Sequence, residues 1–180
     1  MKICKQQDTL QNDLLKNIIM KRILFFSTLI LTCLTFIGCP YESKVPIDKP
    51  TVKINPKYLG TWEHEGNSEK YKITKYNNFT YQIEKIKQDD TLSEKLFAYT
   101  SLVNGTNFLN LWDEPTDTPK KYTLYKLQST SDHTILLSEV TENIDEQFSS
   151  SDQLKKFISE NMNRSYFYTK TDMVLKRIKN

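Results

Sequence analysis

The chain has 180 residues, of which 38% are hydrophobic, and its 25 Lys and Arg against 22 Asp and Glu give a net charge of +3. Residues 1–38 hold five of those cations and two of the anions, which leaves 20 charges of each sign for residues 39–180. A neutral body with mixed signs argues against a nucleic-acid-binding protein, which needs a basic face.

The first strong pattern along the chain is the apolar run Ile23–Ile37, which is 15 residues long and follows Lys21 and Arg22. A membrane-spanning helix needs about 20 apolar residues, whereas the core of a signal peptide has roughly 7–15. The run therefore predicts a signal segment over residues 1–38, and an uncleaved membrane anchor is the alternative.

The segment before Met20 is polar and carries two acidic residues, which is unlike the start of a signal peptide. Met20, Lys21 and Arg22 together form a much better start. We expect Met20 to be the true initiator. The alternative is a real cytoplasmic extension in front of an uncleaved anchor helix.

The apolar run ends at Phe36-Ile37-Gly38-Cys39, which resembles the lipobox of bacterial lipoproteins. The resemblance implies cleavage before Cys39 and lipid attachment to its thiol, with the protein held in the bacterial cell envelope. The residue after that cysteine is Pro40 rather than aspartate, which resembles the pattern of lipoproteins that are sorted to the outer membrane in some bacteria. Cys4 and Cys33 precede the cleavage point, so the mature chain would keep no thiol for a disulfide, catalysis or zinc.

Residues 39–56 contain four of the six prolines of the chain. Proline at this density disfavours helix and sheet and favours an extended segment. We predict a tether that holds the following domain roughly 50 Å from the bilayer. An arm packed on the domain is the alternative.

Residues 57–180 are predicted to form one domain that is mainly β. Apolar residues alternate along short segments, as in Phe79, Tyr81 and Ile83, and turn residues separate the segments. About eight strands of even spacing predict a single antiparallel up-and-down β-barrel. The predicted strands are 58–65, 69–76, 79–86, 95–103, 107–114, 121–130, 133–142 and 165–178.

One short amphipathic helix is predicted before the last strand, within "SSSDQLKKFISENM" (149–162). Ser150 and Gln153 have the spacing of a capping box, and Asp152 lies in the first turn. Leu154 and Ile158 belong to a single apolar stripe. The helix is therefore expected to pack on the sheet.

Gly60-Thr61-Trp62 opens the first strand and resembles the Gly-x-Trp signature of lipocalins. In that family the tryptophan closes one end of an eight-stranded barrel that holds a small apolar ligand, and an arginine packs on the tryptophan. The resemblance implies that Trp62 closes the barrel. Arg177 and Arg164 are the two candidates for the arginine.

The faces of segment 107–114 do not reveal which one points inward, because both are largely apolar. We predict that the rings of Phe108 and Trp112, which flank the amide of Asn110, face a cavity of at least roughly 300 Å³, since aromatic walls with one polar group suit a ligand. Leu109 and Leu111 would then face outward under the helix. A filled core with these leucines inward is the alternative. The candidate ligand-binding residues are Trp62, Tyr81, Phe108, Asn110, Trp112 and Tyr125.

The sequence offers no nucleophile–base pair, so no enzyme is expected. His64 and His133 are interpreted as surface residues, and the acidic loop around Asp113 and Asp117 as a solvated turn rather than a calcium site. No metal and no cofactor are expected. The predicted function is non-enzymatic binding of a small apolar ligand; a protein–protein module, such as an inhibitor or assembly accessory, is the alternative.

Overall fold

A computed structural model describes residues 41–114, 120–141, 144 and 146–178. The predicted signal segment 1–38, Cys39 and Asp117 lie outside the described residues, so the predictions made for them stay predictions. Within the described part of the chain, no helix has the length and hydropathy needed to cross a bilayer.

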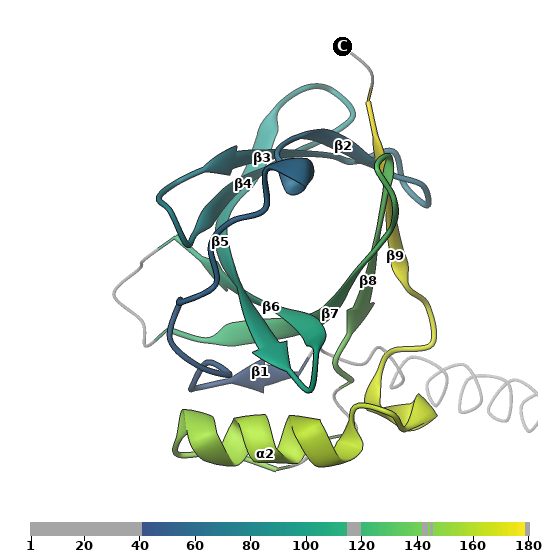
Figure 1. The fold of residues 1–180 in the computed structure, drawn as a ribbon. Helices are drawn as coiled ribbons and strands as arrows, with labels where there is room; N and C mark the ends of the chain where they lie inside the picture. The colour runs from purple at the N-terminus through teal and green to yellow at the C-terminus, as the bar shows by residue number, and fades with distance from the viewer. Residues whose placement is uncertain (1–40, 115–119, 142–143, 145, 179–180) are drawn as a thin grey trace, which may run out of the picture. The chain divides into compact units, whose positions relative to one another are not determined.

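Eight antiparallel strands close into a barrel (Figure 1). Each strand pairs with the next one along the chain, and the last pairs with the first, which confirms the predicted up-and-down barrel. The strands are β2 (Gly60–His64), β3 (Lys70–Lys75), β4 (Tyr81–Ile86), β5 (Leu92–Val103), β6 (Thr106–Asp113), β7 (Tyr122–Ser131), β8 (Thr134–Glu139) and β9 (Met173–Arg177).

The last predicted strand is shorter than the sequence indicates. Ser165–Phe167 forms the 3-10 helix η2, and β9 begins only at Met173. Phe167 is 1% exposed and packs with the helix outside the barrel, and the chain here pairs with the residues at the end of β8 only through an isolated bridge between Tyr168 and Val140.

Apolar side chains form two separate clusters because the strands around β6 are buried on both faces. The interior cluster includes Trp62, Tyr71, Ile73, Tyr81, Ile83, Leu96, Leu109, Leu127, Ile135, Leu137 and Leu175. The outer cluster includes Tyr41, Ile47, Tyr99, Val103, Phe108, Leu124, Val140, Leu154, Ile158 and Phe167.

Helix α2 (Ser151–Asn161) lies outside the barrel wall, below β1 and β6 in Figure 1. The hydroxyl of Ser150 accepts a hydrogen bond from the backbone N–H of Gln153, as the capping-box spacing predicts. Leu154 and Ile158 are each 1% exposed. The predicted helix before the last strand is therefore confirmed, and it covers the outer cluster.

Residues 41–56 lie along the barrel wall, which is the packed-arm alternative to a free tether. The arm begins as β1 (Glu42–Ser43), a ninth strand that pairs with the start of β7, and ends at the 3-10 helix η1 (Pro56–Tyr58). Apolar contacts explain why residues 41–56 pack on the barrel and do not form a free tether. Tyr41 and Ile47 are buried in the outer cluster, and prolines do not prevent such packing.

Candidate functional site

A cavity of about 250 Å³ lies inside the barrel. Its walls are mainly apolar and come from all eight barrel strands except β2. The residues that line it are Tyr58, Tyr71, Ile73, Tyr81, Ile83, Lys85, Glu94, Leu96, Leu109, Leu111, Asp113, Thr123, Tyr125, Leu127, Ile135, Leu137, Met173 and Leu175. This volume is somewhat smaller than the roughly 300 Å³ expected from the sequence.

Trp62 belongs to the floor of the barrel, beside η1. Its ring is 1% exposed, and its Nε1–H donates to the backbone carbonyl of Tyr58 at 2.9 Å. Ile54, Tyr58 and Leu59 pack against the interior cluster from the same end. The end at which β2 starts is therefore covered.

Arg177 packs on Trp62, with its guanidinium carbon 4.3 Å from the ring centre. The same guanidinium donates to the backbone carbonyls of Leu59 at 2.8 Å and of Lys57. Gly60 has a φ of +126°, and a Cβ there would lie 2.7 Å from Arg177 Nη1. The sequence left Arg164 as an equal candidate, but that side chain contacts Tyr166 instead.

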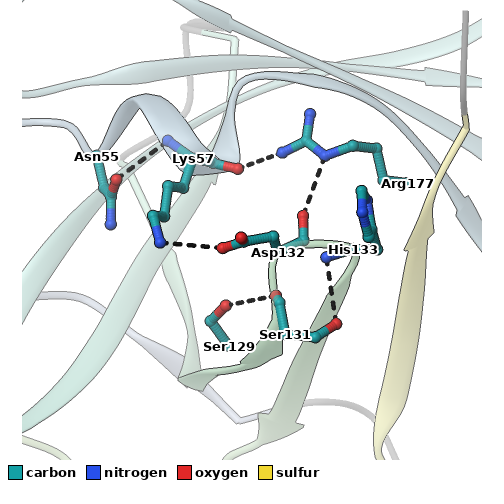
Figure 2. A network of polar contacts seen from close by, with 7 residues as sticks. All are labelled: Asn55, Lys57, Ser129, Ser131, Asp132, His133 and Arg177. Atoms are coloured by element: carbon teal, nitrogen blue, oxygen red, sulfur yellow. Dashed lines mark hydrogen bonds and ion pairs between the residues drawn. The ribbon is translucent and has the colours of Figure 1, made fainter.

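Figure 2 shows how Arg177 joins the floor to the turn between β7 and β8. Its Nε–H donates to the backbone carbonyl of Asp132 at 3.3 Å, and Lys57 Nζ lies 2.9 Å from the Asp132 carboxylate. His133 lies beside this network as an exposed turn residue, whose backbone N–H donates to the hydroxyl of Ser131 at 3.2 Å and whose backbone carbonyl accepts from the Arg177 N–H at 3.0 Å. The network therefore ties η1, the turn between β7 and β8, and the end of β9 together.

The opposite end of the cavity, which we call the mouth, carries the polar side chains. Glu94 lies near the start of β5, Asp113 ends β6 and Thr123 lies near the start of β7, so all three lie at the same end of the barrel. Glu94 and Asp113 are exposed, which leaves this end accessible to solvent.

Two tyrosine hydroxyls lie in the polar end of the cavity, and each contacts a carboxylate. Tyr71 donates to Glu69 at 3.1 Å, and Lys85 Nζ approaches the same carboxylate at 3.2 Å. Tyr125 lies within electrostatic reach of the Glu139 carboxylate. Burial raises the pKa of both tyrosines and of the Glu139 carboxyl, so the hydroxyls stay protonated and act as hydrogen-bond donors.

Of the predicted ligand-binding residues, Tyr81 and Tyr125 line the cavity, and Trp62 belongs to the interior cluster at the floor. The predicted inward orientation of Phe108, Asn110 and Trp112 is wrong. These three side chains point out of the barrel, where they pack with or beneath the helix and the arm.

The physical reason is that the hydrogen-bond partners of the Asn110 side chain lie outside the barrel. Its Oδ1 accepts the backbone N–H of Ile47 at 2.8 Å, and its Nδ2 donates to Ser101 Oγ at 2.8 Å. The residue is 0% exposed, so these bonds offset the cost of burying an amide. Leu109 and Leu111 line the cavity instead.

Sequence reasoning missed the polar end of the cavity. Glu94 and Asp113, which line the cavity, and Glu139, which lies near Tyr125, are carboxylates close to strand ends that look like ordinary turn residues, and only barrel closure brings these strand ends to one opening. Tyr71 had a usable signal, since it shares an inward face with Ile73 in a segment already predicted as a strand.

No group of three His, Cys, Asp or Glu that could hold a metal occurs in the part of the chain that the structure describes. His64 Nδ1 contacts Asn67 at 2.7 Å in an exposed turn. Comparison with known proteins adds no assignment, because no family model, no curated protein and no solved structure matches this chain.

Proposed function

We propose that the protein is a non-enzymatic binding protein of the bacterial cell envelope, lipid-anchored through Cys39, whose barrel takes a small, largely apolar ligand. The observation that carries this proposal is the cavity of about 250 Å³ with apolar walls and a polar end. A barrel that served only as a rigid module for protein contacts would gain stability by filling this space.

The size of the cavity limits the ligand. An apolar cavity of about 150 Å³ is enough to bind benzene, whereas sites for drug-sized molecules have roughly 300–1,000 Å³. A ligand slightly larger than one aromatic ring, or a short branched chain, fits between these limits. Its polar group would lie near the hydroxyls of Tyr71, which donates to Glu69 at 3.1 Å, and of Tyr125.

A titration with 2-naphthol tests the proposal, because its fused rings suit the apolar walls and its hydroxyl suits the polar end. Calorimetry on the full chain is expected to show one site per chain. Leu137 lines the cavity, so Leu137→Trp should fill it and weaken binding at least about tenfold. Leu136 lies on the opposite face of β8, so Leu136→Trp is the matched control and should bind like wild type.

Two results would reject ligand binding inside the barrel. One is wild-type protein that takes up no probe at millimolar concentration. The other is equal binding by the Leu137 and Leu136 variants, because a surface site would not distinguish the two faces of the strand. The lipid anchor is tested separately: Cys39→Ser should abolish incorporation of labelled fatty acid and release the protein from membranes.

A further inference from the structure

The N-terminal arm enters the domain at the mouth of the barrel. Glu42 pairs with Thr123, and Thr123 is one of the residues that line the polar end of the cavity. From there the arm runs along the barrel wall to the floor, where Ile54 N–H donates to the backbone carbonyl of Asn78 at 3.0 Å. The first described residues therefore lie beside the opening.

Contacts along its length fix the arm in this position. Ile47 is 0% exposed, and its backbone N–H donates to Asn110 Oδ1 at 2.8 Å. The Asp48 carboxylate accepts from Lys155 Nζ of helix α2 at 2.9 Å. Tyr41 is 4% exposed and its hydroxyl donates to a backbone carbonyl at 3.1 Å. Tyr41, two residues after Cys39 in the sequence, is therefore already packed into the domain.

We propose that the mouth of the barrel faces the membrane to which Cys39 is attached, so that ligand passes directly between the bilayer and the cavity. This inference rests on the lipid attachment and ligand binding of the proposed function. Three extended residues span at most about 11 Å, so the lipidated residue would lie within that distance of Glu42. A free tether of residues 39–56 would have allowed roughly 50 Å and every orientation.

The orientation defines the chemical class of the ligand. A site that opens toward the bilayer surface takes molecules that partition into membranes, and the apolar part would enter the barrel first, so that the polar group stays near the mouth. The polar residues at the mouth match the headgroup region, and Trp62 and Arg177 close the far end against water. The ligand expected here is a small membrane-partitioned amphiphile rather than a freely soluble metabolite.

Fluorescence quenching in lipid vesicles tests this orientation. β6 has eight residues, so with a rise of about 3.4 Å per residue and a tilt of about 40° the mouth and the floor lie roughly 20 Å apart. Ser93 is exposed at the mouth end and Thr130 is exposed at the floor end. Ser93→Cys and Thr130→Cys give matched labelling sites, since the acylated mature chain would contain no other free thiol.

Each variant is purified as the full lipidated protein, labelled with a small fluorophore and reconstituted into phosphatidylcholine vesicles that carry a spin-labelled headgroup. We expect the Ser93 label to be quenched at least twofold more strongly than the Thr130 label. Twelve Gly and Ser residues inserted between Pro40 and Tyr41 add a flexible span of about 20 Å and should remove the difference.

Equal quenching at the two sites, or stronger quenching at the floor, would overturn the orientation while leaving both lipid attachment and ligand binding intact. A mass spectrum without lipid on Cys39 would overturn the anchor and this inference together. Failure of 2-naphthol to bind would remove the ligand without changing the quenching pattern. The three failures are therefore distinguishable.

Discussion

Trp62 gives the sharpest stability test of the fold. The ring is 1% exposed, donates a hydrogen bond to the Tyr58 carbonyl at 2.9 Å and lies 4.3 Å from the Arg177 guanidinium. Truncation of a buried aromatic residue to alanine costs about 3–5 kcal/mol in packing. A cation–π contact adds roughly 0.5–2 kcal/mol, depending on its exposure. Trp62→Ala should therefore lower the free energy of unfolding by about 4–6 kcal/mol.

A loss of this size is close to half the stability of a typical domain, which is roughly 5–15 kcal/mol. At about 2–4 °C per kcal/mol for a domain of this size, the melting temperature should fall by roughly 10–20 °C. Urea denaturation monitored by circular dichroism measures the free energy, and calorimetry measures the melting temperature. The slope of the urea transition should stay constant if the barrel still unfolds as one unit.

A double-mutant cycle separates the contact with Arg177 from the packing of the ring. Arg177→Met keeps most of the apolar stem and removes the charge and its hydrogen bonds to Lys57 and Leu59. If the two side chains stabilise the floor together, the double variant loses about 0.5–2 kcal/mol less than the sum of the single losses. A Trp62→Ala protein that melts within about 2 °C of wild type would refute the floor assignment.

Three further substitutions test other parts of the fold. Asn110→Ala leaves the Ile47 N–H unpaired, so it should cost about 1–3 kcal/mol in urea unfolding and speed proteolysis within the arm. Ser150→Ala removes the helix cap and should cost about 0.5–2 kcal/mol. Glu139 has a raised pKa because it is buried, so its stabilising effect is present below about pH 4.5 and lost as pH rises through the raised value. Glu139→Gln should therefore gain stability over wild type as pH increases from about 4 to 8.

Matched controls accompany these variants. Asn110→Asp keeps an oxygen for the Ile47 N–H but loses the donor to Ser101, so faster arm proteolysis in the alanine variant alone identifies the lost acceptor. Ser151→Ala lies one residue inside the helix and should be nearly neutral. Glu160→Gln changes a carboxylate that is 60% exposed. A pH profile of that variant identical to the profile of Glu139→Gln would show that burial is not the cause.

The strands and the helix follow from local sequence signals. Alternating apolar residues identify the inward faces of β3 and β4, and Asn104 and Gly105 adopt the positive φ values that their turn requires. The spacing of Ser150 and Gln153 identifies the start of α2. These signals act over a few residues, so they can be read from the chain directly.

Predicting the floor of the barrel from the sequence requires both a local motif and the identity of a distant partner residue. Gly60-x-Trp62 indicates a closed barrel end, but the sequence could not choose between two arginines. Arg177 is selected because β9 pairs with β2 and places it directly opposite Trp62 in the register. Arg164 lies just before η2, outside the barrel strands. Strand pairing, which the sequence does not state, decides the choice.

The orientation of β6 shows why a single strand can mislead. Both of its faces are buried, one by the cavity walls and the other by the arm and helix α2, so alternation of polar and apolar residues carries no information there. Which face of β6 points into the barrel depends on Asn110, because a buried amide must be hydrogen-bonded. Its partner is the N–H of Ile47, a residue 63 positions earlier in the chain. The same amide that makes β6 ambiguous in the sequence thus holds the arm against the barrel.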